Sequence, residues 1–562
     1  MSHPHVVRNA THARSRLWAF CLGISMAAVA CGGGGDPAAP PTPIPPTPTP
    51  IASVTLSHTA GTIQVTGTFQ LSAVPRSAAG AALSGRTVSW ISGAPTVASV
   101  SADGLVTGVS GGTASITATS EGQSASAMIT VLQIASVVVA GPATVEIGVP
   151  GAATAEARTS AGAPLIATFT WTSSNAAAIA VSSGGVLTAV SAGTAIISAS
   201  AAGLTGTLSV TAVPRNINTI VDSVRIARGL PALVGALVTR GGGVVALGVA
   251  GTRRATGGAA ATINDVWHIG SNLKAITGVL AAVAVKQGRI AWTTSVASMF
   301  PELGSTIRTE YRNVTLAELL AMAGGIRNDP PAGAYAGVTA RAQRDAAAAW
   351  GLAAAPIGPR GSFSYSNISY VIAGAMIERA MNGTYEGLLV SALGTPVGAT
   401  QIGFGPTTAA GSTAQPVGHS RVGSAWVACE ACDNPPGLSA AGRAHMTISD
   451  WGRVIHEILK ADAGTSTLID VADARRTVTG VTPVTGGDPY AIGWNATTRS
   501  WGGRTVYHDG SNTTNHSVAW VGLDNGVAFI AATNAADLNG GTSSAALDAM
   551  VGRLLSLHQS GR

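Results

Sequence analysis

HIGSNLKAITG, residues 268–278, is the segment that decides the fold of this 562-residue chain. The chain has 32 basic residues, of which only three are lysines, and one of these, Lys274, follows Ser271 by three positions. Apolar residues continue at helical spacing as far as Lys286, so we expect a helix that begins at Ser271. Because residues three apart share a helix face, the Lys274 amine can reach the Ser271 hydroxyl.

A lysine at this position suggests a chemical role that an arginine could not fill. A serine needs a base to become a nucleophile. A lysine taken out of water can lose its proton, whereas an arginine effectively cannot. The free N–H groups and the dipole at a helix start also favour developing negative charge. Taken alone, however, the pair also fits an N-capping serine followed by a solvated lysine.

Two further motifs add residue types that a serine hydrolase needs. Tyr365 and Asn367 occur in GSFSYSNISYVIAG; a phenol beside a cation can shuttle protons, and an amide can hold a substrate carbonyl. Gly510 and Ser511 occur in VYHDGSNTTNHS, where a glycine on an edge strand would let a substrate approach closely. The N–H of Ser511 could then join that of Ser271 as an oxyanion hole.

Together, in this order and spacing, the motifs resemble those of the serine β-lactamase and penicillin-binding-protein superfamily, in its class C β-lactamase-related branch. Other matching segments are VTLAELLAMAGGI, AAGRAHMTISDWGRVI and YAIGW. The resemblance implies that Ser271 is the acylated nucleophile and Lys274 its activating partner. It further implies that Tyr365 passes protons to the leaving group and to the deacylating water, and that Asn367 contacts the substrate amide or ester. It implies no metal and no organic cofactor.

His508 is the main departure from that family pattern. It stands where class C β-lactamases carry the lysine of a Lys-Thr-Gly triad, followed here by Gly510 and Ser511 along the edge strand. That lysine helps to hold the carboxylate of β-lactams, and a largely neutral histidine would hold it less firmly. The branch with His-x-Gly is similar to esterases, D-aminopeptidases and D-amino-acid amidases.

The C-terminal part, residues 214–562, has the pattern of an α/β (α+β) domain. Hairpin signals lie at residues 236–249 and 517–534, the second around Asn525-Gly526. Helical patterns lie between them. Strands from both ends of this region predict one antiparallel sheet flanked by helices, a β-lactamase-like fold.

A repeat with a period of 81 residues precedes this domain. GLVTGVSGGTASITA begins at Gly104 and GVLTAVSAGTAIISA begins at Gly185, and Trp90 and Trp171 share the same offset. Apolar and polar residues alternate around these marks, with many Val, Ile and Thr, as in short strands.

The repeat predicts two all-β sandwiches, at residues 51–133 and 134–213, each packing one tryptophan between its sheets. The segment TWTSSNAAAIAVSSGGVLTAVSAGTAIISAS resembles the bacterial Ig-like group 2 module. Such modules either bind a partner or act as spacers, and the sequence favours the spacer reading.

The first 31 residues predict a lipoprotein-type signal peptide. Three arginines precede the apolar run LWAFCLGISMAAVA, which is too short to span a membrane stably. Cys31 after AVA resembles the lipidation site of a bacterial lipobox; ordinary cleavage nearby is the alternative. The Gly/Pro-rich residues 32–50 predict an extended linker. We therefore expect an exported protein in the periplasm or at the cell surface, lipid-anchored to a bacterial membrane.

Composition limits the remaining functions. Charged residues make up 10% of the chain and no long basic run occurs, which disfavours nucleic-acid binding. Cys429 and Cys432 form a Cys-x-x-Cys pair without a second pair to complete a zinc site, so a disulfide is expected in an exported protein.

The sequence thus predicts a serine hydrolase that cleaves an ester or amide through a Ser271 acyl-enzyme, of the esterase or D-amino-acid peptidase or amidase type. Its substrate would be a small ester or amide, or a peptide such as one derived from the cell wall. A β-lactamase or D-alanyl carboxypeptidase of the cell envelope is one alternative. A non-catalytic surface adhesion protein is another.

Overall fold

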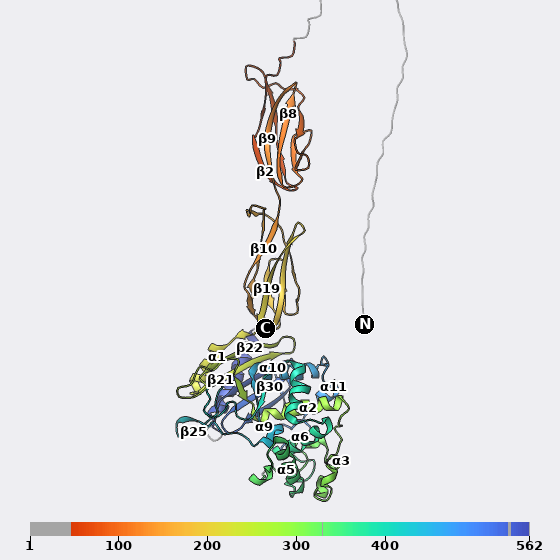
Figure 1. Ribbon diagram of the computed structural model, residues 1–562, viewed down its shortest axis with the longest axis vertical. Helices are drawn as coiled ribbons and strands as arrows, with labels where there is room; N and C mark the ends of the chain where they lie inside the picture. Colours follow the sequence, from red (N-terminus) through yellow and green to blue (C-terminus); the bar gives the residue numbers. More distant parts are fainter. Residues whose placement is uncertain (1–46, 329, 538–540, 561–562) are drawn as a thin grey trace, which may run out of the picture. The chain divides into compact units, whose positions relative to one another are not determined.

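The computed structural model describes residues 47–328, 330–537 and 541–560 (Figure 1). The predicted signal peptide, Cys31 and most of the predicted linker lie outside these residues. The chain divides into two compact units, and the division falls between Val131 and Leu132 in the sequence. Among the described residues, no helix combines the length and the apolar character needed to cross a bilayer.

The first unit is an all-β module made from the first repeat. Its main sheet has the strand order β2-β9-β8-β5, and a second sheet has the order β3-β7-β6. The half-buried Trp90 packs with Leu71 and Ile116 in its core. The strands are β1 (Ser53–Leu56), β2 (Ala60–Gln64), β3 (Thr68–Gln70), β4 (Ala73–Arg76), β5 (Ser89–Ser92), β6 (Ala98–Val100), β7 (Leu105–Gly108), β8 (Gly112–Ser120) and β9 (Gln123–Leu132).

The second repeat folds in the same pattern within the second unit. Its sheets have the orders β11-β19-β18-β15 and β12-β17-β16. Strands β15 to β19 each begin 81 residues after β5 to β9, so the sequence repeat is a repeat of structure. The strands are β10 (Ser136–Ala140), β11 (Thr144–Glu146), β12 (Gly151–Ala152), β13 (Thr154–Arg158), β14 (Pro164–Leu165), β15 (Thr170–Ser173), β16 (Ile179–Val181), β17 (Val186–Ala189), β18 (Gly193–Ala201) and β19 (Leu204–Val213).

A seven-stranded sheet organises the C-terminal domain, in the order β20-β22-β21-β31-β30-β29-β28. Its strands come from both ends of the domain, as the hairpin signals predicted. Neighbouring strands are antiparallel except β20 and β22, which run parallel. They are β20 (Arg215–Asn216), β21 (Ala232–Thr239), β22 (Gly243–Gly251), β28 (Asn495–Arg499), β29 (Gly503–Ser511), β30 (His516–Gly522) and β31 (Val527–Thr533).

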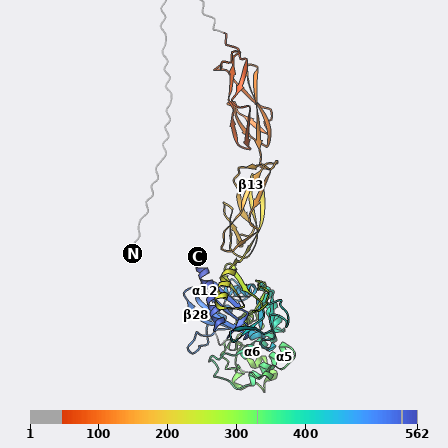
Figure 2. The ribbon, with the colours of Figure 1, turned by 90° about the vertical axis from the view of Figure 1, so that its left-hand side faces the viewer.

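Both faces of this sheet are covered by helices (Figures 1 and 2). On β21, Leu233 and Leu237 point to a cluster with α1 and α12, while Val234 and Val238 point to a larger core that includes α2, α6 and α10. This two-residue alternation confirms an α/β domain with a sheet between helical layers. The helices are α1 (Asn218–Arg228), α2 (Leu273–Lys286), α3 (Val296–Met299), α4 (Leu316–Leu320), α5 (Ala340–Ala353), α6 (Asn367–Met381), α7 (Tyr385–Leu388), α8 (Thr395–Val397), α9 (Ser439–Gly442), α10 (Ile448–Asp462), α11 (Val471–Val478) and α12 (Thr542–Ser560).

Two small sheets complete this domain. One has the order β23-β27-β24 and leads directly into the 268–278 segment; the other has the order β26-β25-β32. Their strands are β23 (Val266–His268), β24 (Ile402–Phe404), β25 (His419–Val422), β26 (Ala425–Ala428), β27 (Ala444–Thr447) and β32 (Ala535–Ala536).

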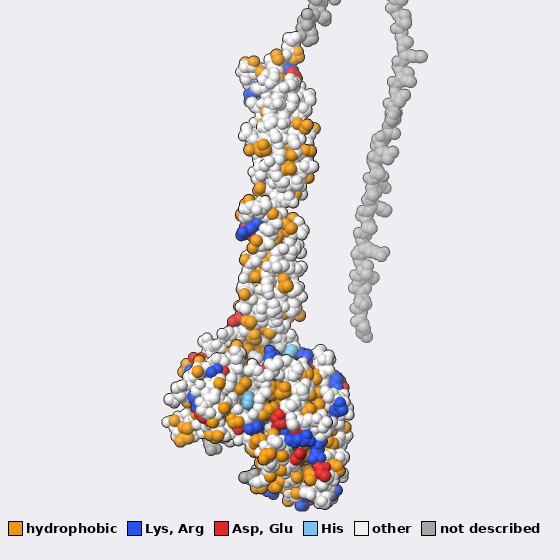
Figure 3. Space-filling view, in the orientation of Figure 1, with side chains coloured by type: hydrophobic (Ala, Val, Ile, Leu, Met, Phe, Trp, Pro, Cys, Tyr) orange, Lys and Arg blue, Asp and Glu red, His pale blue; other side chains and the backbone are white. Residues whose placement is uncertain are grey.

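Charged side chains differ between the two kinds of module. On the face in Figure 3, the β-modules are mostly uncharged, and Lys, Arg, Asp and Glu gather on the helical part of the C-terminal domain. The side chain of Arg344 on α5 is fully buried; it contacts Glu378 on α6 at 2.8 Å and the more exposed Glu386 at 3.0 Å. This ion pair joins two helices of the core.

Replacing Glu378 with glutamine should destabilise the C-terminal domain by about 3 kcal/mol, because a buried cation then loses its buried partner. Urea unfolding followed by near-ultraviolet circular dichroism measures the change. The control is Glu302→Gln, which removes the carboxylate of the exposed Glu302–Arg379 pair at 2.7 Å. That pair should contribute little, and an equal loss in both variants would contradict the account.

Candidate active site

The nucleophile lies on a tight turn pressed against strand β29. A 3-10 turn over Gly270–Asn272 precedes α2, so the α-helix begins two residues later than predicted. Gly270 has a φ of 49°, and a side-chain carbon there would collide with the Ser511 nitrogen. A carbon on Gly510 would collide with the Ile269 carbonyl. Both glycines are therefore needed for this close approach of two backbones.

Lys274 is completely buried beside the nucleophile. Its Nζ donates to Ser271 Oγ at 2.8 Å and to the Ala441 carbonyl at 2.8 Å. Burial lowers the pKa of Lys274 below its ordinary 10.5, although the nearby Tyr365 opposes the shift. Gly493, in the YAIGW segment, lies so close to the first turn of α2 that a side-chain carbon would collide with Ala275. This contact packs the YAIGW segment against the backbone of Lys274 and Ala275.

Tyr365 completes a group of three on the open side of the site. Its Oη donates to Ser271 Oγ at 3.0 Å, and its ring centre lies 5.0 Å from Lys274 Nζ. Tyr365 as a residue is 38% exposed, so the site is open to solvent. The structure thus brings together residues that are 94 positions apart in the chain.

The turn that carries Tyr365 is fixed at the start of α6. Ser366 Oγ caps this helix by accepting the Ser369 N–H at 3.1 Å, and the Asn367 N–H donates to Asn328 Oδ1 at 2.6 Å. The Asn367 side chain is half-buried, two residues after Tyr365.

His508 lies on β29, and its ring is held by the protein. Nδ1 contacts the Asp509 carbonyl, which can only accept, so the ring proton is on Nδ1. Nε2 is then free to accept from Tyr490 Oη at 3.3 Å. Burial lowers the pKa of His508 to about 3, and the neighbouring Lys274 adds to the shift. The imidazole is therefore neutral near pH 7, and both of its ring nitrogens contact groups of the protein.

Cys429 and Cys432 are joined in a disulfide, in the loop between β26 and α9. This loop delivers Asp433 to His268, whose Nε2 lies 3.0 Å from Asp433 Oδ1. Sequence reasoning missed both residues and Tyr490. His268 stands in the segment quoted at the outset, but nothing in the sequence links it to a loop 165 positions away.

Metal coordination finds no support in the part of the chain that the structure describes. There, no group of three or more His, Cys, Asp or Glu side chains is placed to hold a metal ion. The polar groups around Ser271 instead form hydrogen bonds with one another.

Comparison with protein families gives two matches. The family model described as Beta-lactamase matches residues 219–551, and that of the bacterial Ig-like domain (group 2) matches residues 50–131. The second match covers one of the two repeats; the other shares its strand order and spacing.

Solved structures of similar fold include two that span most of the C-terminal domain. One is the D-amino acid amidase from Ochrobactrum anthropi SV3, with 19% identity and a TM-score of 0.51 over 61% of this chain and 98% of that one. The other is the octameric penicillin-binding protein homologue from Pyrococcus abyssi, with 18% identity and a TM-score of 0.50 over 60% and 76%. A search of curated proteins finds no match.

The Beta-lactamase match extends over more than half of the chain and contains every residue of the Ser271 site described above. The chain therefore belongs to the beta-lactamase family of serine hydrolases.

Proposed function

We propose that the C-terminal domain hydrolyses an ester or amide that carries no carboxylate, through an acyl-enzyme on Ser271. The observation that carries this proposal is the fully buried Lys274 amine, 2.8 Å from the Ser271 hydroxyl. Because burial removes the hydration shell of an amine, it favours the neutral form over the charged form, and a neutral amine can act as a base.

Acylation would follow from these contacts. Ser271 Oγ bonds to the substrate carbonyl carbon while its proton moves to Lys274 Nζ. The carbonyl oxygen becomes an oxyanion beside the N–H groups of Ser271 and Ser511. Gly270, the neighbour of Ser271, packs directly against the Ser511 backbone. When the oxyanion collapses, the bond to the leaving group breaks, and Tyr365 passes the proton on to that group.

Deacylation would use the same groups in reverse. A water molecule attacks the acyl carbon and gives its proton through Tyr365 and Lys274 to the departing Ser271 Oγ. The 38% exposure of Tyr365 leaves room for water on this side. The products are a free acid and the restored enzyme.

The neutral His508 favours substrates without a carboxylate at this end of the site. Both of its ring nitrogens are occupied, and its lowered pKa of about 3 removes its charge at neutral pH. A carboxylate placed here would lack a cation to pair with. This supports an esterase or a D-amino-acid peptidase or amidase over a carboxypeptidase or β-lactamase. The D-amino acid amidase from Ochrobactrum anthropi SV3 shares the fold.

Ser271→Ala should abolish labelling by a fluorophosphonate, and Lys274→Arg should slow it at least about 100-fold. The first removes the nucleophile; the second keeps the charge but loses the ability to give up a proton. In-gel fluorescence over time measures the rate.

The matched control for the lysine is Lys286→Arg, at the other end of α2, where Nζ donates to the Thr467 carbonyl and pairs with Asp470. This control should label at the wild-type rate. Rapid labelling of the Lys274→Arg protein would refute the role of Lys274 as the base.

Substrate charge separates the two enzymatic alternatives. The kcat/KM for p-nitrophenyl butyrate or a D-amino-acid p-nitroanilide should exceed that for a chromogenic cephalosporin, which carries a carboxylate, by about 10- to 100-fold, the value of one lost charged hydrogen bond. Steady-state assays at pH 7 measure the ratio. A preference for the cephalosporin would instead favour the β-lactamase or D-alanyl carboxypeptidase alternative.

We also propose that the mature protein is exported and anchored by a lipid on Cys31, with the β-modules as spacers. Cys31→Ser should then move the protein from the membrane fraction to the soluble fraction, because the lipid supplies the membrane affinity. Unchanged fractionation of this variant would rule out the anchor.

A further inference from the structure

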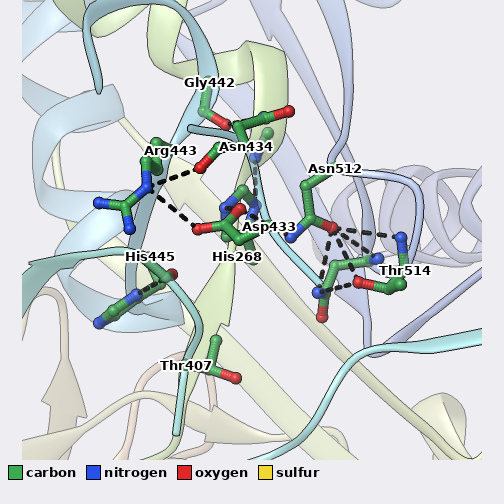
Figure 4. Close-up of polar contacts among 12 residues, drawn as sticks. His268, Thr407, Asp433, Asn434, Gly442, Arg443, His445, Asn512 and Thr514 are labelled. Carbon is green, nitrogen blue, oxygen red and sulfur yellow. Dashed lines mark hydrogen bonds and ion pairs between the residues drawn. The ribbon is translucent and has the colours of Figure 1, made fainter. Parts of the chain in front are cut away.

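A buried carboxylate, that of Asp433, contacts His268, Arg443 and Asn512 (Figure 4). It follows the Cys429–Cys432 disulfide directly and has a side chain only 3% exposed. Its contacts, and those of the next residue, lead to three backbone segments near Ser271: the turn at Gly270, the end of β29 at Asn512, and Gly442. Asp433 can therefore affect the site without contacting the nucleophile.

The first contact runs through His268 to the nucleophile turn. The Gly270 N–H donates to His268 Nδ1 at 3.1 Å, so the single ring proton is on Nε2. Nε2 lies 3.0 Å from Asp433 Oδ1, a close polar contact without hydrogen-bond geometry. Asp433 therefore orients the ring that holds the residue immediately before Ser271.

The second contact runs to the end of β29. Asn512 Nδ2 donates to Asp433 Oδ1 at 3.1 Å. Asn512 follows Ser511, and its own Oδ1 accepts the N–H groups of Asn515 at 2.9 Å and Thr514 at 3.3 Å (Figure 4). Through Asn512, the carboxylate thereby holds the loop of residues 512–515, which directly follows Ser511 of the proposed oxyanion hole.

The third connection comes from the residue after Asp433. Asn434 Nδ2 donates to the Gly442 carbonyl at 2.7 Å, and Arg443 Nε donates to the Asn434 carbonyl at 2.8 Å. Gly442 packs against the Ser271 backbone, since a side-chain carbon on it would lie 3.5 Å from the Ser271 nitrogen. It also follows Ala441, the carbonyl partner of the lysine.

Asp433 is held as an anion in spite of its burial. Burial alone would raise the pKa of Asp433, but the contacts with His268 and Asn512 outweigh it and leave the pKa below its ordinary value. Arg443 Nε lies 3.5 Å from Oδ2 and adds attraction without a hydrogen bond. A buried, ionised group with fixed partners is a rigid anchor for the backbone around it.

We propose that Asp433 is a positioning residue for the reaction of Ser271. Acting through His268 and Asn512, it holds the Gly270–Ser271 turn and the Ser511–Asn512 backbone at the separation that an oxyanion between them requires. This inference rests on the proposed acyl-enzyme mechanism. It assigns a function to the disulfide-closed loop, which the sequence singled out only as a cysteine pair.

Asp433→Asn keeps the shape of the side chain but removes its charge and one acceptor site. It should lower kcat for p-nitrophenyl butyrate about 100-fold, the effect of a displacement of about 1 Å at a reacting centre. KM should change less than about threefold, and the final stoichiometry of fluorophosphonate labelling should stay at the wild-type value while its rate falls. A purely structural role would lower the stoichiometry instead and leave the rate of the folded fraction unchanged.

The matched control is Asp450→Asn, which removes an equally buried carboxylate that pairs with Arg453 at the start of α10. Its kcat should equal that of the wild type. If Asp433→Asn does not fold, His268→Asn takes its place: the shorter side chain can still accept the Gly270 N–H but cannot reach Asp433, and the same fall in kcat is expected.

The outcomes separate the two proposals. Wild-type protein that neither turns over the ester nor labels at Ser271 would overturn the proposed function, and this inference with it. If the wild type is active and the Asp433→Asn or His268→Asn variant has the same kcat as the wild type, this inference alone would be overturned.

Discussion

The active site of this fold depends on the complete burial of one amine, that of Lys274, beside Ser271. The interior offers this side chain a hydroxyl and a carbonyl as partners, and burial lowers its pKa. Transfer of an ammonium group from water to the protein interior costs free energy, and loss of the proton lowers this cost. The helix that carries it lies in the core beneath the sheet, and Gly493 lets a loop close over its first turn. The packing of this domain thus produces a base from a residue that would otherwise be a solvated cation.

Strand β29, which lies next to the edge strand β28, supplies the second constraint. Strand β29 can lie against the nucleophile turn only because Gly270 and Gly510 have no side chains. The same strand carries His508, whose ring bonds to Tyr490 and to a backbone carbonyl. The wall of the site is therefore polar but uncharged. Because His508 is neutral, the proposal is directed toward substrates that carry no carboxylate at this wall.

Sequence reasoning succeeded where the signal is local. The Ser271–Lys274 contact follows from helical spacing, and the 81-residue repeat appears as matching strands. The approach of Tyr365 and β29 came from resemblance, because no periodicity links residues so far apart in the chain. The predicted start of α2, Ser271, was two residues too early. The left-handed Gly270 and the 3-10 turn that follows it cannot be recognised from the spacing of apolar residues. Asp433 was missed because loop contacts depend on tertiary packing alone.

The central claim is that the Lys274 amine is a base, and its titration tests this most directly. The chain has only three lysines, so protein labelled with 13C at the lysine ε carbons gives three NMR signals, and the signal lost in Lys274→Arg identifies the relevant one. The account predicts that this signal titrates below pH 10.5, the ordinary lysine value, so that the neutral amine becomes available as pH rises through that lower midpoint. A midpoint at or above 10.5 would mean that the buried amine keeps its proton, and the mechanism built on it would be wrong.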